Sequence, residues 1–372
     1  MMEKIYLMYG DQSEKMAIAI LEEMKIEEEL LKLGKGKEQL LIGIKPNLVV
    51  AQPAHWGATT CPDLVKGVIK YLRTKGFNNL IILESAWVGD STEKAFEVCG
   101  FKEISQQYQV PLVDLKQDKT KKITAGGVEI ELCEQALTVD YLINMPVLKA
   151  HCQTKFTCAL KNLKGCVPDK EKRRFHRIGL HLPIAYLSKA LSPQLTVVDG
   201  IIGDLTYEGG GTPVRMNRVI ASRDPVAVDA YGAQLIGYAV EEIPYITMAA
   251  QLGVGSLEDI DGRIVELNND KEALLPESLL ASEEADYLSN WIEEKEACSA
   301  CYGSLVHGLM RLKERGQLKQ LKEKVHLGQG FKNMAADKIG IGLCTKDFSS
   351  NVKGCPPKAK DILALLEQRL KK

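Results

Sequence analysis

The chain has 372 residues, which is enough for two domains, and 45% of them are hydrophobic, as in an ordinary globular protein. Its formal net charge of −1 provides no overall attraction to nucleic acids or to an anionic membrane surface. The first residues, MMEKIYLMYG, lack the apolar core of a signal peptide, and no apolar run reaches the length of a membrane span. We therefore expect a cytoplasmic protein with neither nucleic-acid nor membrane partners.

Strand and helix patterns alternate through the first 260 residues. Short apolar runs predict strands at Ile5–Tyr9, Gln39–Ile44, Leu80–Leu83, Val110–Asp114, Tyr141–Met145, Leu195–Val198 and Val219–Ser222. Helical spacing of apolar residues predicts helices at Lys15–Leu33, Leu64–Arg73 and Ser91–Gly100, and a Gly-Gly turn predicts a hairpin at Thr124–Cys133. This alternation predicts an α/β fold, a mostly parallel sheet with helices on both faces.

The strand–helix alternation fades after Ile260, which divides the chain into three predicted parts. Residues 1–260 form an α/β domain with a basic ligand crevice, and residues 261–290 form a linker and the start of a helix. Residues 291–372 form a small helical region that carries four cysteines. Helices are predicted there at Glu284–Lys295, Leu305–Leu321 and Lys358–Leu370.

The stretch from Tyr141 to Cys166 is central to the predicted ligand crevice. A strand ends at Pro146, a polar loop follows, and Phe156 and Leu163 belong to the apolar stripe of a helix. A strand end, a loop and a helix start form the kind of crevice in which open α/β sheets bind ligands. Its basic residues are Lys149, His151, Lys155, Lys161 and Lys164. Two interpretations stay open, a pocket for an anionic group and a solvated basic helix face.

Polar residues also follow other predicted strands, and their repetition favours a pocket at one sheet edge. The candidate ligand-binding residues are Lys45, Asn47, Glu84, Asn162, Asp199, Gly209 and Gly210. The two glycines belong to a glycine run whose N–H groups can approach an anion. The candidate catalytic residues are Lys149, His151 and Lys161. His151 is the proposed proton donor or acceptor, because an unperturbed imidazole titrates near neutral pH.

The stretch Pro168–His176, PDKEKRRFH, is very polar. It suits either a mobile flap over the crevice or a solvated loop, and charge runs more often form solvated loops.

Ten cysteines in a protein expected in a reducing compartment favour metal binding or catalysis over disulfides. Cys298 and Cys301 form a C-x-x-C motif, and Cys344 and Cys355 follow at a distance. A zinc knuckle requires two close cysteine pairs, and the second pair here is separated by ten residues. An iron–sulfur cluster accepts remote cysteines and a proline after the last ligand. We predict a [4Fe–4S] cluster on these four residues, with zinc and four unrelated thiols as alternatives.

The remaining cysteines divide into two groups. Cys152, Cys158 and Cys166, next to His151, are a candidate second metal site, although their spacing matches no standard motif. Cys99 and Cys133 are surrounded by ordinary sequence and are expected to be small core residues.

Several motifs together resemble the DUF362 family over roughly residues 40–255. They are KPNLV at 45–49, ATTCPDLVKGVI at 58–69, INMPVLKAHC at 143–152, ALKNLKGCVP at 159–168, VVDGIIG at 197–203 and ASRDPVAVDA at 221–230. The family commonly has threonine where this chain has Ala150. Members are of largely unassigned activity and many carry iron–sulfur cysteines. A tail like this one, ending in GCPP, is taken to hold one [4Fe–4S] cluster in a subset of the family. The resemblance therefore implies the cluster and the crevice but no reaction.

These observations lead to a cytoplasmic [4Fe–4S] protein that performs or supports a redox step on a small anionic ligand, as an iron–sulfur oxidoreductase would. An electron-transfer protein such as a ferredoxin is the expected partner. The alternatives are a non-catalytic carrier or maturation factor for a cofactor or cluster, and a zinc-stabilised binding protein. The sequence leaves the oligomeric state open.

Overall fold

A computed structural model of the chain describes residues 2–269 and 279–370. Its main body contains an eight-stranded sheet in which every pairing is parallel except β1 with β11 and β10 with β11. In spatial order the strands are β12 (Ile264–Glu266), β1 (Ile5–Tyr9), β11 (Pro213–Ser222), β10 (Leu195–Asp204), β7 (Tyr141–Met145), β2 (Ile42–Pro46), β3 (Leu80–Glu84) and β4 (Leu112–Asp114). The predicted α/β fold with a mostly parallel sheet is confirmed.

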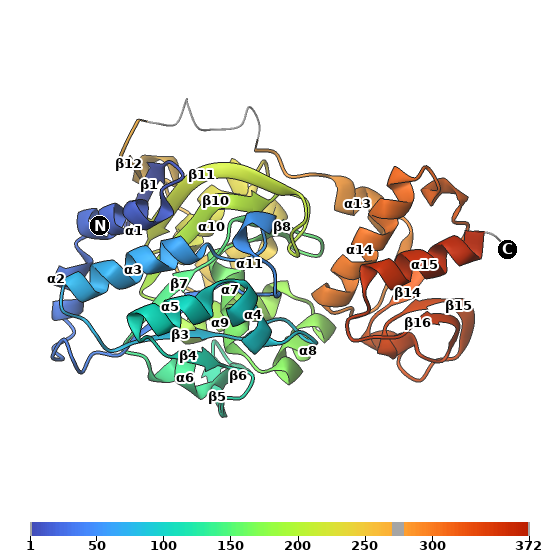
Figure 1. Cartoon of the computed structure of the whole chain (residues 1–372), viewed down its shortest axis with the longest axis horizontal. Helices are drawn as coiled ribbons and strands as arrows, with labels where there is room; N and C mark the ends of the chain where they lie inside the picture. The colour runs from blue at the N-terminus through green and yellow to red at the C-terminus, as the bar shows by residue number, and fades with distance from the viewer. Residues whose placement is uncertain (1, 270–278, 371–372) are drawn as a thin grey trace.

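Helices cover both faces of this sheet, because successive side chains of a strand point to opposite sides. Val197 packs into one hydrophobic cluster and Val198 into the other. The first cluster holds α1 (Ser13–Glu23), α2 (Ile26–Leu31), α3 (Pro62–Thr74), α4 (Thr92–Val98) and α5 (Phe101–Tyr108). The second holds α7 (Ala159–Asn162), α8 (Asp169–Arg177), α9 (His181–Leu191), α10 (Pro225–Leu235) and α11 (Pro244–Gln251). Figure 1 shows the sheet between these two layers.

Several local predictions need correction. The single helix expected over residues 15–33 is two helices, because Lys25 adopts a left-handed backbone conformation between α1 and α2. The polar loop after Pro146 is a short hairpin of β8 (Lys149–His151) and β9 (Lys155–Thr157), and Phe156 lies on β9 rather than on the helix. A second hairpin, β5 (Thr120–Ala125) with β6 (Val128–Cys133), begins earlier than predicted and precedes α6 (Glu134–Thr138).

The polar stretch predicted as a flap or a solvated loop is the helix α8. Its charged residues are not all solvated, since Glu171 and Lys172 are buried together with Phe175. This charged stretch of sequence therefore forms a helix that packs one face against the protein.

The C-terminal region has three helices near the predicted positions, α13 (Glu284–Ser289), α14 (Ser299–Glu314) and α15 (Ala359–Leu370), but it is not only helical. The helix predicted to end at Lys295 stops at Ser289, and the one predicted at Leu305–Leu321 runs from Ser299 to Glu314. It also contains a parallel sheet of β13 (Ile292–Glu294), β14 (Val325–Leu327), β15 (Ala336–Ile341) and β16 (Phe348–Val352), in that order. A hydrophobic core that includes Leu305, Leu309, Val325 and Ile339 joins the two layers. In Figure 1 this region, orange to red, lies beside the main body.

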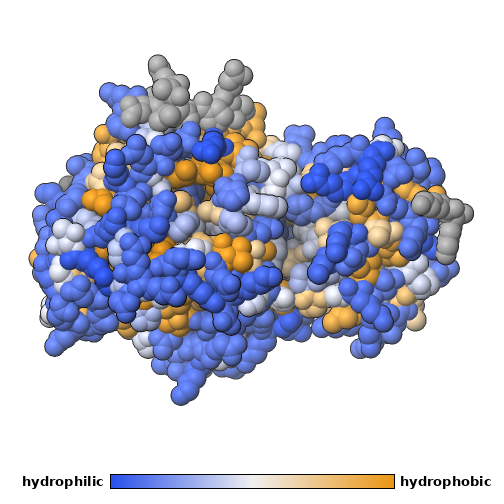
Figure 2. Space-filling view, viewed as in Figure 1, coloured by the Kyte–Doolittle hydropathy of each residue, from blue (hydrophilic) through white to orange (hydrophobic). Residues whose placement is uncertain are grey.

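The predicted linker at 261–290 is only partly a linker. Residues 264–266 form β12, which pairs with β1 at the edge of the main sheet, and α13 begins the C-terminal region. Its middle part, residues 270–278, lies outside the described residues. Within residues 2–269 and 279–370, no helix has the length and apolar character to cross a membrane. Hydrophilic residues cover most of the face in Figure 2, with hydrophobic residues in small patches.

The helices α1 and α3 approach each other most closely at Gly67. A Cβ atom at this position would lie 2.4 Å from the carbonyl oxygen of Glu14. Only a residue without a side chain fits there, because the neighbouring atom belongs to the backbone of α1.

Replacing Gly67 with alanine should therefore destabilise the fold. The higher helix propensity of alanine contributes about 1 kcal/mol, whereas overpacking costs about 1–3 kcal/mol or more against a backbone that cannot rotate away. Gly303→Ala in α14 is the control, because its Cβ would make only an ordinary 3.8 Å contact. Urea denaturation should give a lower free energy of unfolding for Gly67→Ala alone, and a Gly67→Ala protein as stable as the parent would contradict the packing described.

Candidate functional site

A cavity of about 650 Å³ lies at the carboxyl ends of the central strands, where the C-terminal region meets the main body. The main body contributes Asn47, Glu84 and Ser85 from strand ends, and Lys149 and His151 from β8. The C-terminal region contributes residues 298–300 at the start of α14. The other polar lining residues are Thr157, Lys161, Asn162, Lys164, Lys172, His176 and Glu208. Six of the ten predicted ligand-binding and catalytic residues thus meet in one place, Asn47, Glu84, Lys149, His151, Lys161 and Asn162, together with the predicted crevice residue Lys164.

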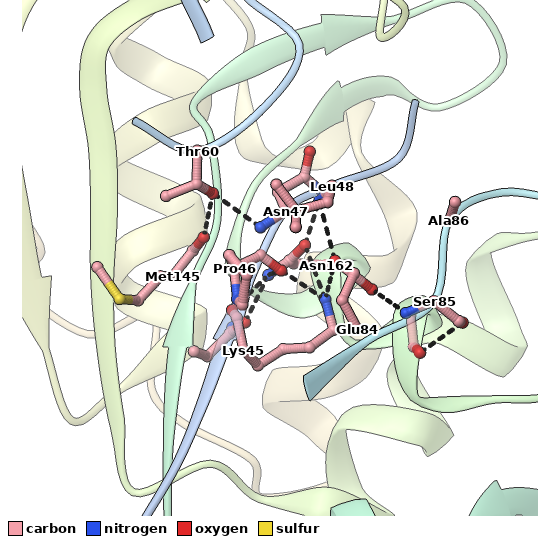
Figure 3. Close-up of polar contacts among 12 residues, drawn as sticks. Lys45, Pro46, Asn47, Leu48, Thr60, Glu84, Ser85, Ala86, Met145 and Asn162 are labelled. Carbon is pink, nitrogen blue, oxygen red and sulfur yellow. Dashed lines mark hydrogen bonds and ion pairs between the residues drawn. The ribbon is translucent and has the colours of Figure 1, made fainter. Parts of the chain in front are cut away.

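The buried polar network in Figure 3 contributes Asn47, Glu84, Ser85 and Asn162 to the cavity wall, with Lys45 behind them. Lys45 Nζ lies 2.7 Å from Glu84 Oε2 and both side chains are almost fully buried, so the pair joins the ends of β2 and β3. Glu84 also accepts hydrogen bonds from the backbone N–H groups of Leu48 and Ser85. Asn47 Nδ2 donates to Asn162 Oδ1 at 2.6 Å, which connects the strand ends to α7. Removing one member would leave a buried charge or amide unpaired, so the network fixes this wall.

Lys149 and Lys172 are buried lysines whose donors are all used by the protein. Lys149 Nζ donates to Asn47 Oδ1 at 2.8 Å and to the carbonyl oxygens of Ala58 and Glu208. Lys172 Nζ donates to the carbonyl and hydroxyl of Ser85 and to the carbonyl of Ala86. Burial lowers the pKa of each ammonium to about 8. These lysines add positive charge to the wall and hold its loops together.

Lys161 and Lys164 are the cations best placed to meet a ligand. In the described part of the chain, the hydrogen bond that Lys161 Nζ makes is to Thr157 Oγ1 at 3.2 Å, so two of its three donors are available. Burial lowers the pKa of Lys161 to about 7, although the Glu208 carboxylate opposes this shift. Burial and the charge of Lys161 hold the pKa of Lys164 well below its ordinary value. Lys155, which sequence also placed in the crevice, instead pairs with Glu242 outside the cavity.

His151 lines the cavity as a neutral imidazole. Its Nδ1 accepts hydrogen bonds from the backbone N–H groups of Gln153 and Thr154, at 3.0 and 3.3 Å, so the ring proton lies on Nε2. Burial and the charges of Lys161 and Lys164 hold the pKa of the ring well below its usual value. The expectation of an imidazole that titrates near neutral pH is therefore wrong.

Glu208 is a cavity residue that sequence reasoning missed. It comes from the turn between β10 and β11, and its Oε1 lies 3.6 Å from His151 Nε2. The sequence signal was present, since Glu208 directly precedes the glycine run from which Gly209 and Gly210 were selected.

Four predicted ligand-binding residues, Lys45, Asp199, Gly209 and Gly210, do not line the cavity. Asp199 accepts hydrogen bonds from the backbone of Cys61 and Ile201, at 2.6 and 3.0 Å, and burial raises its pKa to about 6. Gly210 has φ of 76°, and a Cβ there would lie 2.6 Å from the carbonyl oxygen of Trp56. Lys45 and Asp199 lie on strands and Gly209 and Gly210 on a loop, and their hydrogen bonds and close packing hold the structure behind the cavity.

The four C-terminal cysteines line a second cavity of about 670 Å³. Cys298 precedes α14 and Cys301 lies in its first turn, Cys344 follows β15, and Cys355 lies between β16 and α15. Burial, opposed by the charge of Lys164, raises the pKa of Cys298 to about 11, with smaller effects of the neighbouring thiols in the same direction and of Arg173 in the opposite one. Arg173 and Lys332 also line this cavity. Four thiols around one space are a donor set that suits an iron–sulfur cluster.

Cys298 lines both cavities, so the two spaces share a wall. The helix α8 is also common to both, since Lys172 and His176 face the first cavity and Arg173 faces the second. Within the described ranges, no three or more His, Cys, Asp or Glu side chains are arranged to hold a single metal ion.

The candidate second metal site is not assembled. Cys152 packs against the core of the C-terminal region, Cys158 lies in a cluster of the main body, and Cys166 lies in another. Cys99 and Cys133 are buried core residues, as predicted.

Three comparisons relate the chain to known proteins. The model of the family described as "Domain of unknown function (DUF362)" matches residues 42–234. The chain is 29% identical over 224 residues to the thylakoid-associated protein sll1697 of Synechocystis sp., a match that covers 57% of this chain and 67% of that protein. It is also similar to the lactate racemase apoprotein of Thermoanaerobacterium thermosaccharolyticum, at 16% identity and a TM-score of 0.34. That match covers 52% of this chain and only 50% of the racemase, which is too weak for any argument.

The family match spans more than half of the chain and includes β2, β3, β7, α7 and α8, which position most of the cavity. On this basis, the chain belongs to the DUF362 family.

Proposed function

We propose that this protein holds a [4Fe–4S] cluster on Cys298, Cys301, Cys344 and Cys355, and performs or supports a redox step on a small anionic ligand in the adjacent cavity. The observation that carries the proposal is the position of Cys298, which lines both the space ringed by thiols and the space lined by lysines. A redox centre and a ligand would then be neighbours, separated by one residue.

The residues around the second cavity suit a cluster in their chemistry. Four thiols are the number that a [4Fe–4S] cluster requires, and Pro356 follows the last of them. Arg173 and Lys332 bring positive charge to the same space, which would favour thiolates over thiols. When bound, the cluster would supply single-electron transfer, and an electron-transfer protein such as a ferredoxin is the proposed partner.

The lysines of the first cavity support an anionic ligand. Lys149, Lys161, Lys164 and Lys172 line it, while the carboxylates in its lining are Glu84 and Glu208, and Glu84 is already paired with Lys45. Uncompensated ammonium groups are costly to bury, and an anion would offset that cost. Lys161 would bind the anion directly, because it has donors to spare. Lys149 and Lys172 would keep the wall in place, and His151 would donate from Nε2.

A cluster carrier or maturation factor is the second candidate. The observation that favours it is the exposure of Cys355, which would leave one edge of a cluster open to an acceptor protein. We propose a cytoplasmic location for either function, because all ten cysteines are unpaired, as in a reducing compartment.

Metal analysis tests the cluster. Protein purified without oxygen should contain about four iron and four sulfide ions per chain and give a paramagnetic signal on reduction. Cys301→Ser should lose most of the iron and stay folded, because the C-terminal region has its own hydrophobic core. Cys61→Ser, outside the second cavity, should retain the iron. Stoichiometric zinc without iron, or full iron in Cys301→Ser, would refute the cluster.

Binding of simple anions tests the first cavity. Succinate or inorganic phosphate should raise the melting temperature of the protein. Lys161→Met should weaken that binding by about tenfold to a hundredfold, as expected for the loss of a charge-assisted hydrogen bond. Lys155→Met, which removes a lysine outside the cavity, is the matched control. Equal affinities for the parent and Lys161→Met would show that anions bind elsewhere.

A further inference from the structure

Two buried polar atoms lie close together in the first cavity, and neither has a hydrogen-bond partner among residues 2–269 and 279–370. They are His151 Nε2 and Glu208 Oε1, and both residues are only 3% exposed. Buried polar groups are nearly always paired, and leaving one unpaired costs about 1–3 kcal/mol. Because both atoms belong to residues that line the cavity, a ligand atom is the natural partner.

The protein fixes the hydrogen-bonding role of each atom. Nε2 of His151 carries the ring proton and is a donor, because Nδ1 accepts two backbone N–H groups. On Glu208, Oε2 accepts the N–H of Cys152 at 3.1 Å, which leaves Oε1 as an acceptor. The 3.6 Å between Nε2 and Oε1 is too long for a hydrogen bond, but one oxygen atom to the side of the pair can lie about 2.8 Å from each.

A single ligand atom that both accepts and donates a hydrogen bond would satisfy both groups at once. A hydroxyl group does both, whereas an ammonium group cannot accept and a carboxylate cannot donate. We propose that His151 and Glu208 form a hydroxyl-recognition subsite, so that the ligand is a small anion that also carries a hydroxyl group. This inference rests on the proposed anion site and specifies the class of its ligand.

The surroundings of the pair agree with such a ligand. The charges of Lys161 and Lys164 act on His151, so an anionic group would lie close to the hydroxyl. The helix α14 approaches the pair at Gly303, where a Cβ atom would be 3.8 Å from Glu208 Oε1. The C-terminal region therefore covers the subsite and would exclude bulk water from it.

Matched pairs of anions test the subsite by calorimetric titration of the full chain. Malate should bind about tenfold to a hundredfold more tightly than succinate, or glycerol 3-phosphate more tightly than propyl phosphate, because the deoxy compound leaves both buried atoms unpaired. If only the two carboxylic acids show this preference, the natural anionic group is a carboxylate, and if only the two phosphates show it, the group is a phosphate. Glu208→Met and His151→Phe should abolish the preference, and Trp87→Phe, which also lines the cavity, should keep it.

The possible outcomes separate the subsite from the anion site. Equal affinities for the hydroxylated and deoxy anions would overturn the subsite and leave the anion site standing, with only a water between the two atoms. No binding of any of the four anions would overturn both. A preference that persists in folded Glu208→Met and His151→Phe would overturn the assignment to this pair. The affinities of hydroxylated and deoxy anions are compared in the parent protein. The test therefore remains decisive even if a variant misfolds.

Discussion

The first cavity contains more buried ammonium groups than carboxylates, and the rest of the site depends on this imbalance of charge. Four lysines line it together with two carboxylates, of which Glu84 is already paired with Lys45, and Lys172 lies 3.5 Å from Asp169 outside the lining. Burial and the repulsion between positive charges lower the pKa of every one of these lysines. A bound anion would raise these pKa values, so the lysines would take up protons and regain positive charge. The same lysines also place positive charge near the cavity wall that contains Cys298.

The C-terminal region closes one side of the first cavity with residues 298–300, and hydrogen bonds hold it against the main body. Ser299 Oγ donates to Gln153 Oε1 at 2.7 Å, and Gln153 Nε2 donates to the carbonyl oxygen of Ala297 at 3.0 Å. Farther along, Gln329 Nε2 donates to the carbonyl oxygen of Arg173 at 3.0 Å. The first two bonds fasten the start of α14 to the hairpin β8–β9, and the third fastens the segment after β14 to α8. The thiol cavity and the lysine cavity are thereby kept on two sides of the same wall.

The sequence located the edge of the sheet correctly but not the role of each side chain there. Polar residues after parallel strands do meet at one edge, and six of the nominated residues line the cavity. Lys45 and Asp199 obey the same rule, yet their polar atoms are used by Glu84 and by backbone N–H groups. Spacing along a chain cannot reveal which neighbour will use a side chain.

Other features depended on tertiary contacts that leave little trace in the sequence. The helix α8 looked like a charged loop because the burial of Lys172 depends on carbonyl groups nearly ninety residues away. Two of the C-terminal strands have three residues each, which is too short for an alternating pattern. The pKa of His151 is lowered by burial and by the charges of Lys161 and Lys164, which the residue type alone does not reveal.

Calorimetry in buffers of different ionisation enthalpy tests the central claim most directly, because it counts the protons exchanged when an anion binds. The pKa of Lys161 is about 7, so this side chain is largely neutral at pH 8, and a bound anion would raise the pKa and draw a proton from solution. The account predicts net proton uptake when succinate or phosphate binds at pH 8, with affinity falling as the pH rises above 7. Binding without proton uptake, or with proton release, would contradict it.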